Sequence, residues 1–185
     1  MRNRLVLASE SPRRKEILKS RGLEFTAVKS GYTETDSGDP VTTAVNNALG
    51  KARDVFVKEG SPSGVTVLGA DTVVFYGGEI IGKPENAQAA VETLKKLSGK
   101  THKVVTGYAI VGKNSVKTGY DVSEVTFNEL SDALIKEYVG SGLPLDKAGS
   151  YGLQDGFPIV KSFSGDRENV IGLPFDKIVK ETGGF

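Results

Sequence analysis

The sequence contains no cysteine, no tryptophan and only one histidine, His102, among its 185 residues. Without cysteine, the protein has no disulfide, no thiolate nucleophile and no zinc–thiolate site. With one histidine and no cysteine beside it, a histidine-based metal site is not expected either. A lone histidine next to a predicted strand is more often structural than catalytic, and this is our interpretation of His102.

A strong net charge and a long apolar run are also missing. The net charge is +1, so no overall field directs the protein to a nucleic acid polymer or to a membrane. The first apolar run is too short for a signal peptide, and no stretch approaches the ~20 apolar residues of a membrane span. We therefore expect a cytoplasmic protein, with residues 1–185 forming one domain or two small lobes that share a cleft.

The first segment predicts a strand that leads directly into a helix. Leu5–Ala8 is apolar, Ser11 is a good N-cap, and Pro12 suits the first helical position. The helix then begins with Arg13 and Arg14, although a helix N-terminus favours negative charge. Cations there indicate a site in which backbone amides and guanidinium groups together hold a phosphate. A solvated face is an equally open interpretation, because an exposed misplaced charge costs only about 0.3–1 kcal/mol.

Strands and helices alternate along the rest of the chain. Strands are predicted over 24–28, 65–68, 72–76, 79–81, 102–111, 116–127 and 157–163. Helices are predicted over 41–56, 87–97, 131–140 and 173–182. This mixture predicts an α/β fold with a mixed, twisted sheet and flanking helices.

Asp71 is the most informative acidic residue. It interrupts the apolar run 67–75, whose other residues predict burial on both faces of a sheet. A charge in such a place is expensive unless it is paired or binds a metal. Asp71 could cap a turn between two strands, but the surrounding apolar residues favour a metal ligand or a general base at a strand end.

Other charged candidates are weaker when each is taken alone. Glu34 lies in a polar loop, where acids are usually only solvated. Lys83 stands between Gly82 and Pro84, which hold it more firmly than a helix face would, although lysines in turns are common. Lys51 lies at the edge of the apolar stripe of 41–56, where its stem could simply cover apolar surface.

Taken together, these residues suit one chemistry. The oxygen ligands of Glu34 and Asp71 suit a divalent cation such as Mg²⁺ or Mn²⁺, and the cations at positions 13, 14, 51 and 83 suit a polyphosphate. The chain has neither the Gly-x-x-x-x-Gly-Lys-Ser/Thr sequence of P-loop proteins nor a Gly-x-Ser-x-Gly sequence. Metal-assisted attack of water on a phosphate is the scheme that remains.

The same segments, in their order and spacing, resemble the Maf family of nucleoside triphosphate pyrophosphatases. The resemblance covers essentially the whole chain, although each segment alone would be weak. It rests on Leu7–Arg14, the Glu34 loop, Lys51–Ala52, Gly69–Val74, Gly82–Pro84, Leu97–Gly99, Asp146–Gly149, Tyr151–Gln154 and Gly172–Pro174.

The resemblance implies hydrolysis of a nucleoside triphosphate to the monophosphate and pyrophosphate, with a divalent metal ion as cofactor. It also implies a Maf/ITPase-like α/β fold with two lobes around a deep cleft, often in a homodimer. The implied roles are general base for Asp71, metal binding for Glu34 and Asp71, substrate binding for Ser9, Arg14, Lys51 and Lys83, and base specificity for Arg13, Thr72 and Gln154.

Arg13, Thr72 and Gln154 resemble the branch of the family that acts on dTTP, UTP and modified pyrimidine nucleotides. A glutamine amide suits this task, since it offers both a donor and an acceptor to a uracil or thymine edge. Two positions depart from the family pattern. Glu10 stands where a small residue is usual, and Thr33 stands where many relatives have a second acid.

Two other functions stay open at the level of the sequence. The protein could be a nucleotide-binding regulator of cell division that does not cleave its ligand, although binding alone does not require Asp71. It could also be a phosphomonoesterase that releases orthophosphate. The phosphorus product would separate these three functions.

Overall fold

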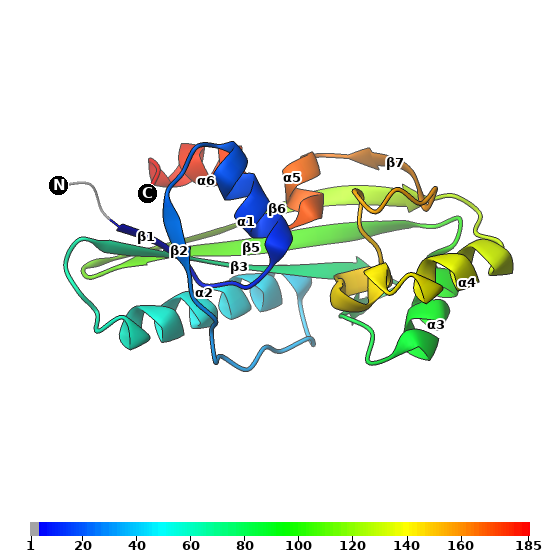
Figure 1. The fold of residues 1–185 in the computed structure, drawn as a ribbon, viewed down its shortest axis with the longest axis horizontal. Helices are drawn as coiled ribbons and strands as arrows, with labels where there is room; N and C mark the ends of the chain where they lie inside the picture. Colours follow the sequence, from blue (N-terminus) through cyan, green and yellow to red (C-terminus); the bar gives the residue numbers. More distant parts are fainter. Residues whose placement is uncertain (1–3) are drawn as a thin grey trace.

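A mixed sheet of seven strands forms the centre of the computed structural model, which describes residues 4–185 (Figure 1). The strands are β1 (Arg4–Leu7), β2 (Phe25–Ala27), β3 (Val65–Tyr76), β4 (Glu79–Ile81), β5 (Thr101–Gly112), β6 (Ser115–Phe127) and β7 (Val160–Ser164). Their order is β2-β1-β3-β5-β6-β7, with β4 paired to β3. β1 is parallel to β2 and β3, and the other pairs are antiparallel, so the predicted mixed sheet is confirmed.

The break that the sequence predicted within 65–76 is wrong, because β3 is continuous. It pairs with β5 without interruption from Val67 to Phe75, and Asp71 lies opposite Gly107 in this ladder. Asp71 is therefore in the middle of a strand and not at its end. The long neighbouring strand supplies the hydrogen bonds that keep Gly69 and its neighbours extended.

Three helices begin after the capping residues that the sequence predicts, Ser11, Asp39 and Ser131, whereas the last helix begins at Phe175, two residues later than predicted. The helices are α1 (Pro12–Ser20), α2 (Pro40–Lys58), α3 (Ala87–Leu97), α4 (Asp132–Gly140), α5 (Arg167–Ile171) and α6 (Phe175–Thr182). The Ser11 side chain accepts from the backbone N–H of Arg14, and that of Asp39 accepts from Thr42 at the start of α2. The short helix α5 was not predicted, and the last strand begins three residues later than the 157–163 prediction.

Helices cover both faces of the sheet and form two lobes along it (Figure 1). In the lobe that contains both chain ends, α2 packs on one face of β1, β3 and β5, while α1 and α6 pack on the other. At the far end, α3 and α4 share a separate core with the ends of β5 and β6. The long strands pass through both lobes, as the two-lobed prediction requires.

Two glycines let α2 lie unusually close to the sheet. A Cβ atom at Gly69 would stand 2.2 Å from the backbone oxygen of Ala48, and one at Gly107 would stand 2.3 Å from the backbone carbon of Ala44. Side chains at these two positions would push the helix away. The close approach brings the polar side chains of α2 within reach of Asp71.

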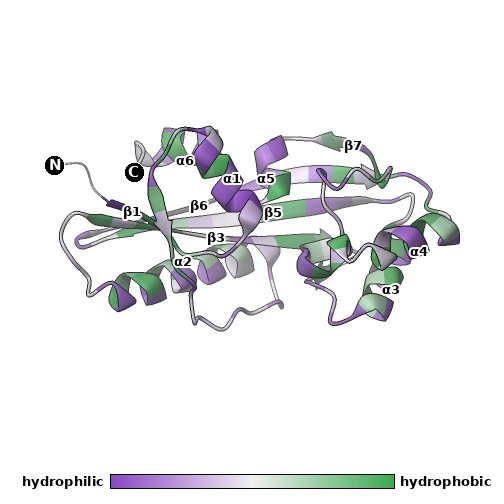
Figure 2. Ribbon diagram, viewed as in Figure 1, coloured by the Kyte–Doolittle hydropathy of each residue, from purple (hydrophilic) through white to green (hydrophobic). Residues whose placement is uncertain are grey.

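The hydropathy of the residues along the long strands changes where one lobe meets the other. Figure 2 shows hydrophobic residues at the two ends of the long strands and more polar ones in the middle, where the two lobes meet. Within residues 4–185, no helix combines the length and the apolar character needed to cross a membrane.

Candidate active site

A cavity of about 630 Å³ opens between the two lobes, above the middle of β3. Its size is that of a small-molecule site. All the site residues predicted from the sequence line it, namely Ser9, Arg13, Arg14, Glu34, Lys51, Asp71, Thr72, Lys83 and Gln154. The fold thus brings together residues from α1, α2, β3 and several loops.

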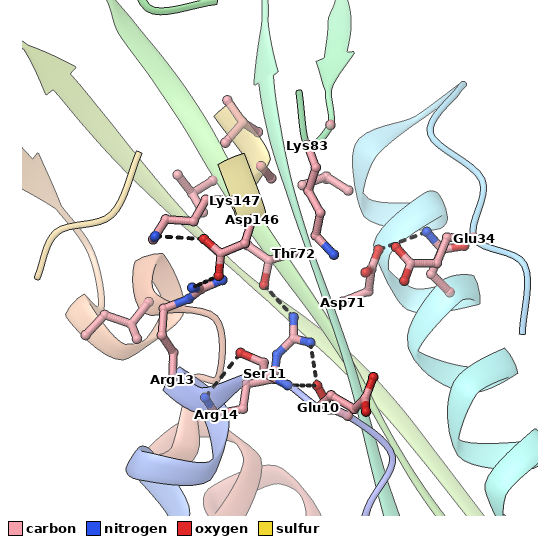
Figure 3. A pocket seen from close by; sticks show the side chains of 18 of the residues that line it. Glu10, Ser11, Arg13, Arg14, Glu34, Asp71, Thr72, Lys83, Asp146 and Lys147 are labelled. Carbon is pink, nitrogen blue, oxygen red and sulfur yellow. Dashed lines mark hydrogen bonds and ion pairs between the residues drawn. The ribbon is translucent and has the colours of Figure 1, made fainter. Parts of the chain in front are cut away.

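Glu34 and Asp71 form the acidic side of the cavity (Figure 3), and Lys51 lies between them. Its Nζ lies 2.7 Å from Asp71 Oδ1 and 2.7 Å from Glu34 Oε1. Asp71 is only 5% exposed, and its second oxygen accepts a hydrogen bond of 2.8 Å from Asn47 Nδ2. The odd-numbered residues of β3 face α2, which explains why Asp71 meets two α2 side chains.

Arg14 lies across the cavity floor from this acidic side. Its guanidinium donates to Gly172 O at 2.8 Å, to Thr72 Oγ1 at 3.1 Å and to Ser9 Oγ at 3.3 Å. Burial lowers the pKa of Arg14 from its usual value, and the nearby charge of Asp71 acts in the opposite direction. An anion bound beside the guanidinium would offset the effect of burial on this pKa, because it would stabilise the charged form.

The opposite wall holds Arg13 by an ion pair. Arg13 Nη1 lies 2.8 Å from Asp146 Oδ2, and Lys147 Nζ lies 2.8 Å from the other oxygen of the same carboxylate (Figure 3). Burial alone would raise the pKa of Asp146, but the hydrogen bonds from Lys147 and Arg13 outweigh it and lower this pKa. Arg13 is therefore held at the cavity by a carboxylate that remains ionised.

Lys83 and Gln154 differ from the other predicted residues. Within residues 4–185 neither side chain makes a hydrogen bond or an ion pair, and both are exposed at the cavity. Figure 3 shows Lys83 pointing into the space between Asp71 and Asp146. These two side chains are thus available to a ligand at no cost in existing contacts.

The far end of the cavity is more apolar. It is lined by Val74, Val104, Ala148, Tyr151, Val170 and Ile171. The Tyr151 hydroxyl lies 2.8 Å from His102 Nε2, behind the cavity wall. Burial lowers the pKa of His102 to about 4, so the ring is neutral at pH 7. His102 does not line the cavity, in agreement with the structural role expected for it.

Sequence reasoning gave no role to several lining residues. Asn47 lies one helical turn before Lys51, and this spacing was the available signal for a shared face. Asp146 and Lys147 belong to a segment that carried the family resemblance, but their pairing with Arg13 joins positions 133 residues apart. Of the two departures noted, Glu10 lines the cavity and pairs with Lys29 at 3.3 Å, whereas Thr33 does not line it.

Glu34 and Asp71 are the residues that could hold a divalent cation. The Lys51 ammonium already lies between them, so the two carboxylates are placed to share one positive charge. Among residues 4–185, no group of three or more acidic or histidine side chains could form a complete metal cage. Mg²⁺ does not require one, since one or two carboxylates, water and substrate phosphates commonly complete its shell. The donor set therefore fits an ion whose remaining positions are filled by water or by phosphate oxygens.

Comparisons with known proteins show the family to which the chain belongs. The family model described as Maf-like protein matches residues 4–183. The dTTP/UTP pyrophosphatase of Bacillus thuringiensis subsp. konkukian is 45% identical over 98% of this chain and 95% of its own length. The dTTP/UTP pyrophosphatase of Thermococcus kodakarensis is 46% identical over 97% of this chain and 96% of its own. Among solved structures, the Ham1 protein of Staphylococcus aureus has a TM-score of 0.47 and 14% identity, covering 68% of this chain and 72% of that chain.

Proposed function

The chain belongs to the Maf family, and from this premise we propose that it hydrolyses dTTP, UTP and modified pyrimidine nucleoside triphosphates to the monophosphate and pyrophosphate. The observation that carries the proposal is the position of Asp71, a nearly buried carboxylate on the wall of a cavity that also contains Arg14, Lys51 and Lys83. The names of the two relatives support the choice of substrate.

The triphosphate binds along the cationic part of the cavity. Arg14 contributes a guanidinium beside the N-terminus of α1, where backbone N–H groups favour an anion. Lys83, without an ionic partner of its own within residues 4–185, approaches from the opposite lobe. Two lobes that each supply a cation hold the charged tail between them, which orients the phosphates for an in-line attack.

Asp71 serves as the general base. Its carboxylate accepts the proton of a water molecule as the oxygen attacks the α-phosphorus, and pyrophosphate leaves. Lys51 neutralises part of the charge that develops on the phosphate oxygens, because its ammonium lies beside the base. Its present partner Glu34 is 45% exposed at the side chain, so solvent and phosphate compete for the same ammonium.

We propose Mg²⁺ or Mn²⁺ as the cofactor, held by Glu34 and Asp71. When bound, the ion would supply Lewis-acid stabilisation of the phosphate oxygens. The exposed side chain of Glu34 can turn from Lys51 toward a second cation, whereas Asp71 is fixed by the sheet.

Arg13, Thr72 and Gln154 set the preference for the base. Arg13 is oriented by Asp146, and the Gln154 amide is unpaired within residues 4–185, so it can donate to and accept from a pyrimidine edge. A base lacking these groups would leave buried polar atoms unpaired, which lowers its rate of reaction.

The deciding experiment incubates the protein with a panel of pyrimidine and purine triphosphates and either Mg²⁺ or Mn²⁺, and identifies the phosphorus product. We expect pyrophosphate and the monophosphate, formed fastest from dTTP or UTP. Orthophosphate would identify a phosphomonoesterase instead. Saturable binding without a product would identify a nucleotide-binding regulator of cell division, which the names of the relatives do not favour.

A homodimer and a cytoplasmic location complete the proposal. Sedimentation velocity of the purified protein checks the first, and fractionation of cells checks the second. A monomer at all concentrations would remove the dimer without affecting the proposed reaction.

A further inference from the structure

Asn47 connects two parts of the cavity wall that are distant in the sequence. Its side chain is 1% exposed, on the face of α2 that meets the sheet. Its Nδ2 donates to Asp71 Oδ2 at 2.8 Å and to Thr35 O at 2.8 Å. Its Oδ1 accepts from the Thr35 backbone N–H at 3.0 Å. One amide thus binds both the mid-sheet carboxylate and the loop before α2.

The orientation of this amide is fixed by its partners. The Thr35 N–H needs an acceptor, which only Oδ1 of the amide can supply. The Asp71 carboxylate needs a donor, which only Nδ2 can supply. Both hydrogens of Nδ2 are then used, on Thr35 O and on Asp71. A fully satisfied buried amide of this kind allows one arrangement of its neighbours and makes others expensive.

Apart from the ion pair of Glu34 with Lys51 and the Tyr32 ring against Gly50, the loop that carries Glu34 makes few contacts. Residues 31–39 are all exposed, and this part of the loop is in neither helix nor strand. Ser37 O accepts from Thr43 Oγ1 at 2.9 Å, and Gly31 N donates to Asp54 at 2.8 Å, which fixes the loop near its two ends. Between these points, the contacts of Asn47 with Thr35 lie next to Glu34 in the chain.

We propose that Asn47 is a positioning residue that holds the Glu34 loop at a set distance from Asp71, so that the two carboxylates can share a cation. The inference rests on the proposed function. Asn47 accepts no proton and supplies no ligand to the ion; it acts through its hydrogen bonds to Thr35 on one side and to Asp71 on the other.

Packing alone does not account for an asparagine here. The neighbouring inward residues of α2 are Ala44 and Ala48, which are fully buried and apolar. Asparagine is a poorer helix former than alanine or leucine, and a buried amide must find hydrogen bonds. Its partners lie outside α2, in Asp71 and Thr35, so the residue serves the cavity wall and not the helix.

The test compares Asn47→Ala with Asn46→Ala, its neighbour on the exposed side of the same helix. We expect Asn47→Ala to lower kcat about 10–100-fold, as the loss of a supporting hydrogen bond typically does, while KM for dTTP changes little. Mn²⁺ affinity without nucleotide, measured by electron paramagnetic resonance of the free ion, should fall about tenfold or more. Asn46→Ala should leave all three quantities unchanged.

Amide hydrogen exchange of Thr35, followed by NMR without nucleotide or metal, reports the contact itself. We expect exchange about tenfold faster in Asn47→Ala, the equivalent of one lost hydrogen bond. Asn47→Asp provides a second variant, since its ionised carboxylate keeps an acceptor for the Thr35 N–H but has no hydrogen to donate to Asp71 or to Thr35 O. It should retain Thr35 protection and still lose kcat.

The outcomes separate this inference from the proposed function. If the wild type cleaves triphosphates and Asn47→Ala keeps its kcat and Mn²⁺ affinity, Asn47 is only structural and the inference is wrong, while the proposed reaction stands. If the wild type cleaves no triphosphate, the proposed function fails. Mn²⁺ affinity and Thr35 exchange in the two alanine variants then decide the inference, and no change in either overturns it.

Discussion

The cavity has two buried lysines on its two sides, each between two carboxylates, and the proposed reaction uses only one of them. The side chain of Lys51 is 10% exposed and that of Lys147 is 8% exposed. Each ammonium lies within 3.3 Å of two acidic side chains. Burial and charge alone therefore do not distinguish the proposed catalytic lysine from its counterpart.

Lys147 keeps two fixed partners besides Asp146, whose own side chain is 56% exposed. Its Nζ donates to the backbone oxygen of Leu143 as well as to the carboxylate of Asp146, and it lies 3.3 Å from Asp155. The Asp155 carboxylate also accepts from the hydroxyl of Tyr138 at 2.5 Å. Burial first and this carboxylate second raise the pKa of Tyr138 above its usual value. This cluster ties the turns after α4 to the helix.

Within residues 4–185, Lys51 Nζ bonds to no backbone carbonyl and contacts only the carboxylate oxygens of Glu34 and Asp71. Glu34 lies on an exposed loop, so this contact is easily exchanged for a phosphate oxygen or water. The comparison teaches that a lysine is available to a substrate when one of its partners can leave. A lysine saturated by fixed partners stabilises the fold instead.

Replacing Asp71 should give the largest loss of activity, and so the largest difference between the two lysine clusters. We expect Asp71→Asn to lower kcat about 10³-fold, because the amide cannot accept a proton from water, while the protein still folds. The matched variant is Asp155→Asn, the nearly buried acid of the other cluster, which should reduce stability and leave kcat unchanged. Steady-state kinetics and urea unfolding of both variants check this. Near wild-type turnover in Asp71→Asn would remove the proposed base.

Exchanging each lysine for methionine sharpens the comparison further. Lys51→Met should lower kcat/KM about 100-fold, since a cation beside the phosphate is lost. Lys147→Met should leave the buried Asp155 without its cation and reduce the unfolding free energy by about 3 kcal/mol. The measurement is again kinetics with urea unfolding. Equal losses of activity in the two variants would show that both lysines act on the substrate.

Much of the fold follows from local rules, and these predictions are confirmed. Ser11 and Asp39 begin α1 and α2 because their side chains satisfy free N–H groups, a signal contained in four residues. The turn over 112–115 between β5 and β6 is equally local. The continuity of β3 was missed because Gly69 is typical of a turn in the sequence. Position 69 is a glycine because the backbone of α2 lies so close to β3 that no side chain fits there.

In the site, too, some features follow from the sequence and others only from the assembled fold. The predicted site residues all line one cavity, since the family resemblance and their charge selected them together. Their partners could not be predicted in this way. Asn47 meets Asp71 across 24 residues, and Arg13 meets Asp146 across 133, so only the assembled fold reveals these pairs. The roles of the site residues themselves stay predictions.

Arg13 tests the specificity side of the cavity with a smaller expected effect. Arg13→Ala should reduce the ratio of kcat/KM for dTTP to that for dGTP about tenfold, because a charged hydrogen bond to the base is lost. Asp146→Ala should give part of this effect, since Asp146 orients the guanidinium. Arg21→Ala is the control, because Arg21 pairs with Glu168 and Asp176 and does not line the cavity. An unchanged ratio in Arg13→Ala would exclude a specificity role.

The smallest effect concerns stability alone, behind the apolar end of the cavity. Burial lowers the pKa of His102 to about 4, below its usual value of 6.5, so the unfolded chain binds a proton that the folded chain does not between these pH values. Stability is therefore lost as pH falls from 6.5 toward 4, by about 2 kcal/mol between pH 7 and pH 4.5 from this residue. His102→Gln can still donate to Tyr151. Its unfolding free energy should fall by about 2 kcal/mol less than that of the wild type over the same pH interval, because the carboxylates contribute equally to both proteins. Urea unfolding at both pH values measures the difference. If the stability of the two proteins fell in parallel with pH, His102 would be protonated in the folded protein at pH 4.5. The interpretation of His102 as a neutral ring that supports Tyr151 would then be wrong.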